Sequence, residues 1–209
     1  MEKAAFIWDL DGTILDSYGI IVSSLYKTYR KFGVELDRDE IHKEVIRFSV
    51  GDYISKLEKT TGLPAAAIKE MVSENNDTEQ LNIKPIKNAA EVLEYLKSRH
   101  IPSYVFTHKG RSTQTVLKNI GLYDFFDEII TGKDGFPRKP DPAAINYLID
   151  KYNLEKACTF YVGDRSLDVE CAANAGIKSI LYLPENSPAK PTGKETFIVK
   201  DLLDIAGII

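Results

Sequence analysis

Two aspartates separated by one residue follow a short apolar run near the start of the chain. The run FIW precedes the segment DLDGT at residues 9–13. In an extended chain, residues i and i+2 point to the same side, so Asp9 and Asp11 can face one site while Leu10 faces away. Two such carboxylates can divide nucleophilic attack and proton transfer between them. Taken alone, the segment is also compatible with an acidic turn in which Gly12 adopts an unusual backbone conformation.

Three later segments carry further polar residues that are suited to chemistry. Thr107 ends the run YVFT, Lys139 lies in PRKPDP, and Asp164 and Asp168 lie in GDRSLD. Each has an ordinary explanation when it is considered singly. A threonine can finish a strand, a lysine can be a solvated charge, and Asp168 can complement the positive end of a helix. Their ordered occurrence with the paired aspartates favours one site built from all four segments.

The elements that must position these residues alternate between strands and helices. Apolar runs typical of buried strands occur at 4–10, 101–107, 127–132, 158–164 and 176–183, and helical periodicity occurs at 88–100, 112–122, 142–154 and 166–176. This alternation predicts an α/β fold with a Rossmann-like, doubly wound parallel sheet. In such sheets ligands bind beyond the carboxyl ends of the strands, where Asp9, Thr107 and Asp164 are expected to gather.

Residues 17–83 interrupt the alternation. This interval contains no clear strand and several helical stretches, separated by glycine or proline residues. We therefore expect an α/β core domain formed by residues 1–16 and 84–209, with an inserted all-helical cap domain at 17–83. A polar loop at 184–197 is expected to be followed by a short strand and a helix.

The overall composition excludes several classes of protein. Hydrophobic residues make up 44% of the 209 residues, which is enough for a packed interior. The formal net charge of −4 gives no broad basic field, so we expect no nucleic-acid or membrane partner. The first residues resemble neither a secretory signal nor a membrane span, so a cytoplasmic location is expected. Cys158 and Cys171 lack the spacing of a disulfide framework or a zinc site.

The four motifs occur in the order found in haloacid dehalogenase-like (HAD) hydrolases, and the sequence resembles this superfamily over essentially the whole chain. It lies near the phosphoglycolate phosphatase-like branch, in which a helical cap is inserted after the first motif. The resemblance implies a magnesium-dependent phosphatase that acts on a small phosphorylated metabolite through an aspartyl-phosphate intermediate. The natural ester is left open, and so is the choice between a monomer and a homodimer.

The resemblance also implies catalytic and metal-binding roles. Asp9 is expected to be the nucleophile, and Asp11 the general acid and base. Mg²⁺ is expected on the side chains of Asp9 and Asp164 and on the backbone carbonyl of Asp11, with Asp168 supporting the ion or coordinating it through water. This set of oxygen ligands suits a hard octahedral cation.

Phosphate binding is expected from Thr107 and Lys139, which would hold the transferring phosphoryl group. His108 and Lys109 directly follow Thr107 and can contribute a hydrogen-bond donor or a positive charge to the substrate. For His108, a solvent-facing or structural role is the alternative.

Specificity is expected from the cap. The segment around residues 47–51 resembles the cap loop that faces the active site in relatives, which makes Phe48 and Gly51 candidate substrate contacts. The alternative is a turn between helices, with Phe48 and Val50 in the core of the cap itself. A closing cap favours small soluble phosphate esters.

Other functions are compatible with the same motifs. A sugar phosphomutase would keep Asp9 as the phosphate carrier and Asp11 as acid and base, and would differ in cap contacts and water exclusion. Dehalogenation is disfavoured because those enzymes lack the second aspartate. From a different class, a phospho-accepting signalling protein or a binding protein uses similar residues. The long helical insertion and the late GDRSLD segment disfavour a phospho-accepting signalling protein.

Overall fold

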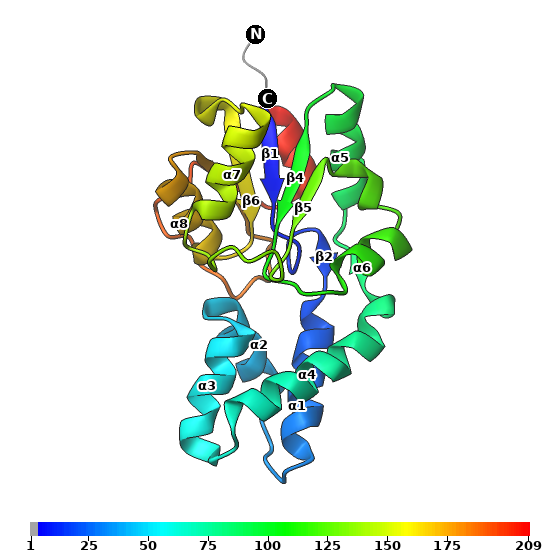
Figure 1. Ribbon diagram of the computed structural model, residues 1–209, viewed down its shortest axis with the longest axis vertical. Coiled ribbons are helices and arrows are strands. Elements are labelled where there is room, and N and C mark those ends of the chain that lie inside the picture. The colour runs from blue at the N-terminus through cyan, green and yellow to red at the C-terminus, as the bar shows by residue number, and fades with distance from the viewer. Residues whose placement is uncertain (1–3) are drawn as a thin grey trace. The chain divides into compact units, whose positions relative to one another are not determined.

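The computed structural model describes residues 4–209, apart from the side chains of residues 76–78. The chain forms two compact units (Figure 1). One, which we call the α/β unit, contains the residues up to Asp16 together with Lys84–Ile209, and the other, the helical unit, contains Ser17–Ile83. No helix in the described part of the chain combines the length and apolar character needed to cross a membrane.

The α/β unit contains a six-stranded parallel sheet within the described residues, in the order β5-β4-β1-β6-β7-β8. Its strands are β1 (Ala5–Trp8), β4 (Ser103–Phe106), β5 (Glu128–Ile130), β6 (Thr159–Gly163), β7 (Lys178–Tyr182) and β8 (Phe197–Val199). The predicted parallel sheet is confirmed, and β1 pairs with both β4 and β6. The chain segments that leave these strands therefore meet at one edge.

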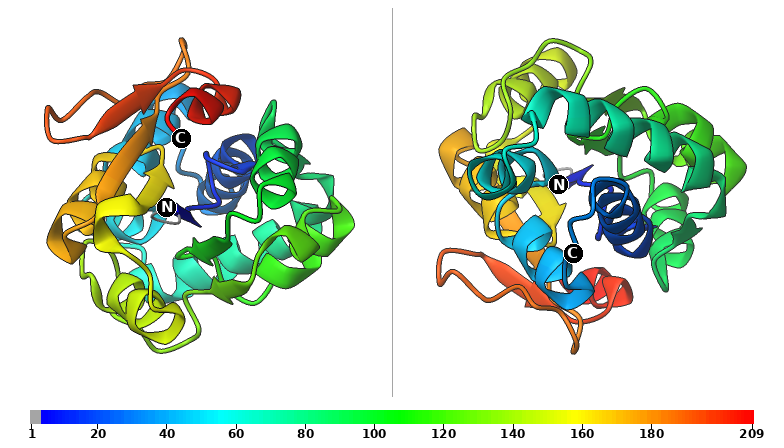
Figure 2. Two further views of the ribbon diagram at one scale, coloured as in Figure 1. Left: turned by 90° about the horizontal axis from the view of Figure 1, so that it is seen from above. Right: turned by 90° about the horizontal axis from the view of Figure 1, so that it is seen from below.

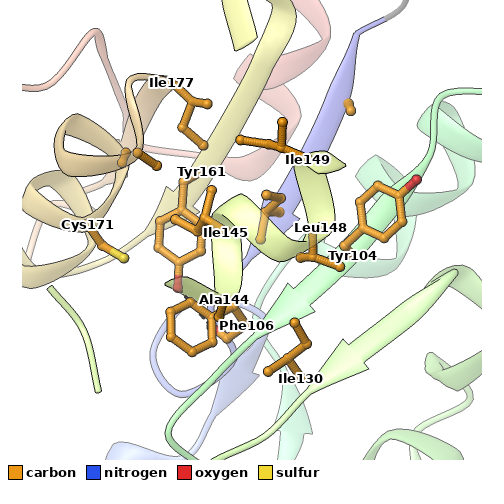
Figure 3. Close-up of a cluster of buried hydrophobic side chains, with 14 residues drawn as sticks. Tyr104, Phe106, Ile130, Ala144, Ile145, Leu148, Ile149, Tyr161, Cys171 and Ile177 are labelled. Atoms are coloured by element: carbon orange, nitrogen blue, oxygen red, sulfur yellow. Dashed lines mark hydrogen bonds between the residues drawn. The ribbon is translucent and has the colours of Figure 1, made fainter. Parts of the chain in front are cut away.

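Helices connect the strands and cover the sheet. They are α5 (Ala89–Ser98), α6 (Thr113–Asn119), α7 (Ala143–Tyr152) and α8 (Ser166–Ala175), with short 3-10 helices η2 (Tyr123–Phe125), η3 (Lys156–Cys158) and η4 (Leu202–Gly207). Apolar side chains of α7 and α8 pack against β1, β4 and β6, as Figure 3 shows for Ile145, Leu148, Tyr161 and Cys171. Because side chains alternate along a strand, Phe6 of β1 points to the opposite face and stacks on Phe160. The helices α5 and η4 lie together on that side (Figure 2) and are linked by a hydrogen bond from the Tyr95 hydroxyl to the Ala206 carbonyl.

A second, two-stranded ladder was not predicted from the sequence. The strands β2 (Leu15–Asp16) and β3 (Lys84–Pro85) pair in antiparallel fashion, with Asp16 opposite Lys84. Each strand has two residues, which is too short for a recognisable hydrophobic period. The ladder brings together the two points at which the chain leaves and re-enters the α/β unit.

The helical unit contains α1 (Tyr18–Arg30), α2 (Arg38–Arg47), α3 (Val50–Thr61), α4 (Ala65–Glu79) and the 3-10 helix η1 (Gln80–Asn82). The side chains of Asp37 and Ser49 accept backbone N–H groups at the starts of α2 and α3, and Gly62 ends α3 with a positive φ. Buried residues including Leu25, Ile41 and Ile54 form a core that belongs to this unit alone. The predicted all-helical insertion is confirmed.

Candidate active site

The candidate site lies at the carboxyl ends of three adjacent strands of the α/β unit. Asp9 follows β1, Thr107 follows β4 and Asp164 follows β6. All three residues are buried. The structure brings them together because β1 is hydrogen-bonded to both β4 and β6 in parallel register.

A tight turn that contains Asp11 begins directly after Asp9. The carbonyl oxygen of Leu10 accepts the N–H groups of residues 13–15 at 3.1, 2.9 and 2.8 Å, and Gly12 has a φ of 83°, a conformation that favours glycine. The two carboxylates differ in their exposure to solvent. The Asp9 side chain is 2% exposed, whereas that of Asp11 is 23% exposed.

Lys139 is a fully buried lysine that faces two of the aspartates. Its side chain is 0% exposed, its Nζ lies 3.0 Å from Asp9 Oδ1, and it donates to Asp168 Oδ1 at 2.7 Å. Burial alone would lower the pKa of Lys139, but the charges of Asp168 and Asp9 outweigh it and raise that pKa above its usual value. Lys139 is therefore a fixed positive charge at neutral pH.

Asp9 is held as an anion by two cations. Burial raises the pKa of Asp9, but Lys139 and Arg165 lower it more strongly, so that it lies below the usual value for aspartate. Arg165 Nη2 is 3.5 Å from Asp9 Oδ2. Arg165 is a site residue that was not predicted, although its position inside GDRSLD, directly after Asp164, indicates that it lies at the same strand end.

Three carboxylates form a group whose oxygen atoms could hold a cation. Ligand atoms of Asp9, Asp164 and Asp168 all lie within 4.8 Å of one another. Asp9 Oδ2 is buried and accepts no hydrogen bond from the described residues. The hydroxyl of Thr13, the last residue of DLDGT, to which no role was assigned from the sequence, donates to Asp164 Oδ1 at 3.4 Å. An all-oxygen donor set of this kind fits Mg²⁺.

Asp168 also caps the start of α8. Its Oδ1 accepts from Lys139 Nζ, and its Oδ2 accepts the backbone N–H of Arg165 at 3.1 Å. The carboxylate thus caps the helix as well as pairing with the buried lysine. It lies tightly over Gly163, where an added Cβ would be 2.3 Å from Asp168 Cγ.

His108 contacts the loop that carries Lys139. Its Nε2 accepts the backbone N–H of Lys139 at 2.8 Å, and Arg138 Nη2 lies 3.1 Å from its Nδ1. Burial, together with the charges of Lys139 and Arg138, lowers the pKa of His108 to about 3. The ring is therefore neutral at neutral pH, and its observed contact positions the lysine loop. A substrate contact by the neutral His108 ring stays a prediction.

Thr107 and Lys109 lie in one turn after β4. The Thr107 hydroxyl accepts the backbone N–H of Lys109 at 3.1 Å. The Lys109 side chain reaches the first motif, where Nζ donates to Asp11 Oδ1 at 3.2 Å. Asp11 therefore pairs with Lys109, whereas Asp9 pairs with Lys139 and Arg165.

Phe48 and Gly51, the two residues predicted as substrate contacts in the insertion, lie in the helical unit. Phe48 lies between α2 and α3 and is 42% exposed, with the Arg47 guanidinium 5.0 Å from its ring centroid. Phe48 is therefore outside the core of the helical unit, whereas Val50 packs partly against that core. Gly51 lies in the first turn of α3. A substrate contact by Phe48 or Gly51 stays a prediction.

Comparisons with known proteins agree on one family. A family model described as haloacid dehalogenase-like hydrolase matches residues 6–182. The pyrophosphatase PpaX of Oceanobacillus iheyensis is 24% identical over 100% of this chain and 98% of that protein. A phosphoglycolate phosphatase of Thiobacillus denitrificans is 28% identical over 82% of this chain and 79% of that protein.

Solved structures show the same fold at low identity. A crystal structure described as that of a predicted phosphoglycolate phosphatase from Haemophilus somnus has a TM-score of 0.87 and 21% identity, covering 100% of this chain and 98% of that chain. A hydrolase from Pseudomonas syringae has a TM-score of 0.78 and 24% identity, covering 98% of this chain and 97% of that chain.

Proposed function

The chain belongs to the haloacid dehalogenase-like hydrolase family, and on this premise we propose that it is a magnesium-dependent phosphatase that hydrolyses a small phosphate monoester through an aspartyl-phosphate on Asp9. The observation that carries the proposal is the buried Asp9 carboxylate, which Lys139 and Arg165 hold as an anion at the carboxyl end of the central strand. A carboxylate that is ionised and desolvated is prepared for nucleophilic attack.

The first step is attack by Asp9 on phosphorus, with departure of the alcohol. Two unit negative charges about 4 Å apart repel each other by about 4 kcal/mol at an effective dielectric constant of about 20. Lys139 and Arg165 both form ion pairs with Asp9, and their positive charges offset this repulsion. The Thr107 hydroxyl, at the end of the neighbouring strand, is placed to hold a phosphoryl oxygen.

Asp11 is proposed as the general acid and base. It donates a proton to the leaving oxygen and then accepts one from the water that hydrolyses the aspartyl-phosphate. Its partly exposed position supports this role, because the proton must be exchanged with the leaving group and with water. Asp9 is instead held as an anion by Lys139 and Arg165, as a nucleophile requires, so the two carboxylates divide the chemistry.

Magnesium is proposed as the cofactor, and the residues fit it. Asp9 and Asp164 would offer side-chain oxygens and Asp11 its backbone carbonyl, while Asp168 supports the ion and anchors Lys139. The buried Asp9 Oδ2, which accepts no hydrogen bond from the described residues, supports this assignment. When bound, Mg²⁺ supplies positive charge between the carboxylates and the phosphoryl oxygens.

The helical unit, residues 17–83, is proposed as a cap domain, and residues 1–16 with 84–209 as the catalytic core. The division into two compact units, each with buried residues of its own, supports this organisation. The names of the curated relatives support pyrophosphate and phosphoglycolate as the first substrates to try. A small phosphorylated metabolite is the proposed partner in either case.

Phosphate release from a panel of small phosphate esters and pyrophosphate, with Mg²⁺ or with a chelator, tests the proposal. We expect release with Mg²⁺, and we expect the chelator to abolish it. Mg²⁺ should also raise the melting temperature of the wild-type protein, since binding to the folded state stabilises it. This second readout does not depend on turnover.

The variant Asp9→Asn removes the proposed nucleophile while keeping the shape of the side chain. We expect its turnover to fall by roughly 10³-fold or more with the circular dichroism spectrum unchanged. Asp150→Asn, an exposed substitution on α7, is the matched control and should keep full activity. Ordinary turnover by Asp9→Asn would refute the assignment of the nucleophile.

A further inference from the structure

We propose that Arg165 competes with the divalent cation for the Asp9 carboxylate, so that this arginine sets the Mg²⁺ concentration at which the site fills. The guanidinium holds the carboxylate in the metal-free protein and gives up this place when the site is loaded. The inference rests on the proposed function in one respect, because it takes the group of Asp9, Asp164 and Asp168 as the Mg²⁺ site.

One oxygen of the Asp9 carboxylate is open to a cation. Asp9 Oδ1 lies 3.0 Å from Lys139 Nζ, whereas Oδ2 is buried and accepts no hydrogen bond from the described residues. The neighbouring Asp168 carboxylate already accepts on both oxygens, from Lys139 Nζ and from the Arg165 backbone N–H. Asp9 Oδ2 is therefore the oxygen of its carboxylate that is left for a metal ion.

The Arg165 guanidinium lies beside that same oxygen. Its Nη2 is 3.5 Å from Asp9 Oδ2. Charge-assisted N–H···O hydrogen bonds are usually about 2.7–2.9 Å long, so this ion pair is a loose one. A cation held at this distance lends its charge to the oxygen without a close hydrogen bond. It can be replaced by a cation that coordinates the oxygen directly.

The backbone of Arg165 is anchored independently of its side chain. Its N–H donates to Asp168 Oδ2 at 3.1 Å, and its carbonyl accepts the N–H groups of Asp168 and Val169 at 3.0 and 3.4 Å. These bonds form the start of α8. The side chain can therefore turn away from Asp9 while the helix start stays in place.

Two cations that approach one carboxylate oxygen repel each other. In a buried site this repulsion is screened little by salt. Lys139 does not compete at Oδ2, since its Nζ faces Asp9 Oδ1 and Asp168 Oδ1. Of these two partners of Asp9, Arg165 is thus the one that opposes binding of the ion at Oδ2.

The test measures the affinity for Mg²⁺ in the absence of substrate. Isothermal titration with magnesium chloride, at neutral pH and constant ionic strength, gives Kd for the wild-type protein and its variants. Arg165→Gln and Arg165→Met remove the charge, whereas Arg165→Lys keeps it. Arg99→Gln, at the exposed end of α5, is the matched control for the change in net charge.

We expect both neutral variants of Arg165 to bind Mg²⁺ about 10-fold more tightly than the wild type, a change that corresponds to about 1.4 kcal/mol. Arg99→Gln should keep the wild-type Kd, and Arg165→Lys should lie closer to the wild type than to the neutral variants. The melting temperature is a second readout. At a Mg²⁺ concentration near the wild-type Kd, the ion should raise the melting temperature more in the neutral variants than in the wild type. One folded neutral variant is enough to decide the question.

Equal or weaker Mg²⁺ binding by the neutral variants would overturn the inference, because Arg165 would then not oppose the ion. The same tightening in Arg99→Gln would also overturn it, since net charge alone would explain the effect. Both results leave the proposed function intact. Absence of Mg²⁺ binding by the wild-type protein and by all its variants would instead refute the proposed metal site, and this inference with it.

Discussion

At the residue scale, the two aspartates of the first motif differ in burial and in the cations that they contact. Asp9 is buried and faces Lys139 and Arg165, whereas Asp11 is partly exposed and faces Lys109. Two carboxylates in different surroundings can be tuned for different roles, one as a nucleophile and the other in proton transfer. The sequence shows the pair, but the cations that distinguish its members come from other segments.

The partly buried ring of His108 makes stability depend on pH. Its pKa is lowered from 6.5 to about 3, chiefly by burial and then by Lys139 and Arg138. Between these values the unfolded chain binds a proton that the folded protein excludes. The contribution of the neutral ring is therefore fully present above about pH 6.5 and is lost as the pH falls toward 3.

We predict that lowering the pH from 7.5 to 5 reduces the free energy of unfolding less in His108→Gln than in the wild type. The difference should reach at most about 2 kcal/mol, because about 1.5 pKa units separate pH 5 from the unfolded value and each is worth about 1.4 kcal/mol. Urea unfolding at the two pH values measures it. The exposed His100→Gln is the control. The same pH dependence in His108→Gln and the wild type would contradict the prediction.

At the element scale, the junction between β6 and α8 joins fold and site. Gly163 ends β6, and Asp168 lies in the first turn of α8. The Asp168 carboxylate packs over Gly163, accepts the Arg165 N–H and pairs with Lys139. A single side chain therefore connects the strand end, the helix cap and the buried lysine.

We predict that Gly163→Ala destabilises the protein by about 1–3 kcal/mol, the usual cost of overpacking. The new methyl group would lie 2.3 Å from Asp168 Cγ, so Asp168 must move and release Lys139. Urea unfolding and phosphate release should both decline. Gly19→Ala in α1, where no atom lies within 4 Å of the added Cβ, should instead stabilise by about 0.5–1 kcal/mol. A Gly163→Ala variant as stable and active as the wild type would contradict this packing argument.

At the scale of the whole molecule, the two compact units have separate interiors. The residues buried between α7, α8 and the sheet all belong to the α/β unit, and those buried among α1–α4 all belong to the helical unit. The β2–β3 ladder places Asp16 opposite Lys84, so the chain can be closed at that point by a short turn.

We predict that the α/β unit folds when residues 17–83 are replaced by a short Gly-Ser linker. Its own core and sheet remain complete, so thermal unfolding followed by circular dichroism should stay cooperative. Under the proposed function, the shortened protein should still hydrolyse 4-nitrophenyl phosphate but discriminate less between small esters. An unfolded product would show that the α/β unit depends on the helical unit.

Much of the fold could be predicted from the sequence because its signals are local. The strand and helix ranges follow from hydrophobic periodicity and from glycine and proline positions. Asp9, Thr107 and Asp164 could be expected at one edge because parallel strands share a direction. Those residues do lie together, and their catalytic roles stay predictions that the proposed experiments test.

The partners of the site residues were decided by the tertiary structure. Lys109 reaches Asp11 across 98 residues of chain, and His108 accepts the Lys139 N–H across 31. No local pattern encodes such contacts, because they depend on which strands become neighbours and on how the loops after them turn. The sequence by itself determined the elements and the residues at their ends; packing determined which charge faces which carboxylate.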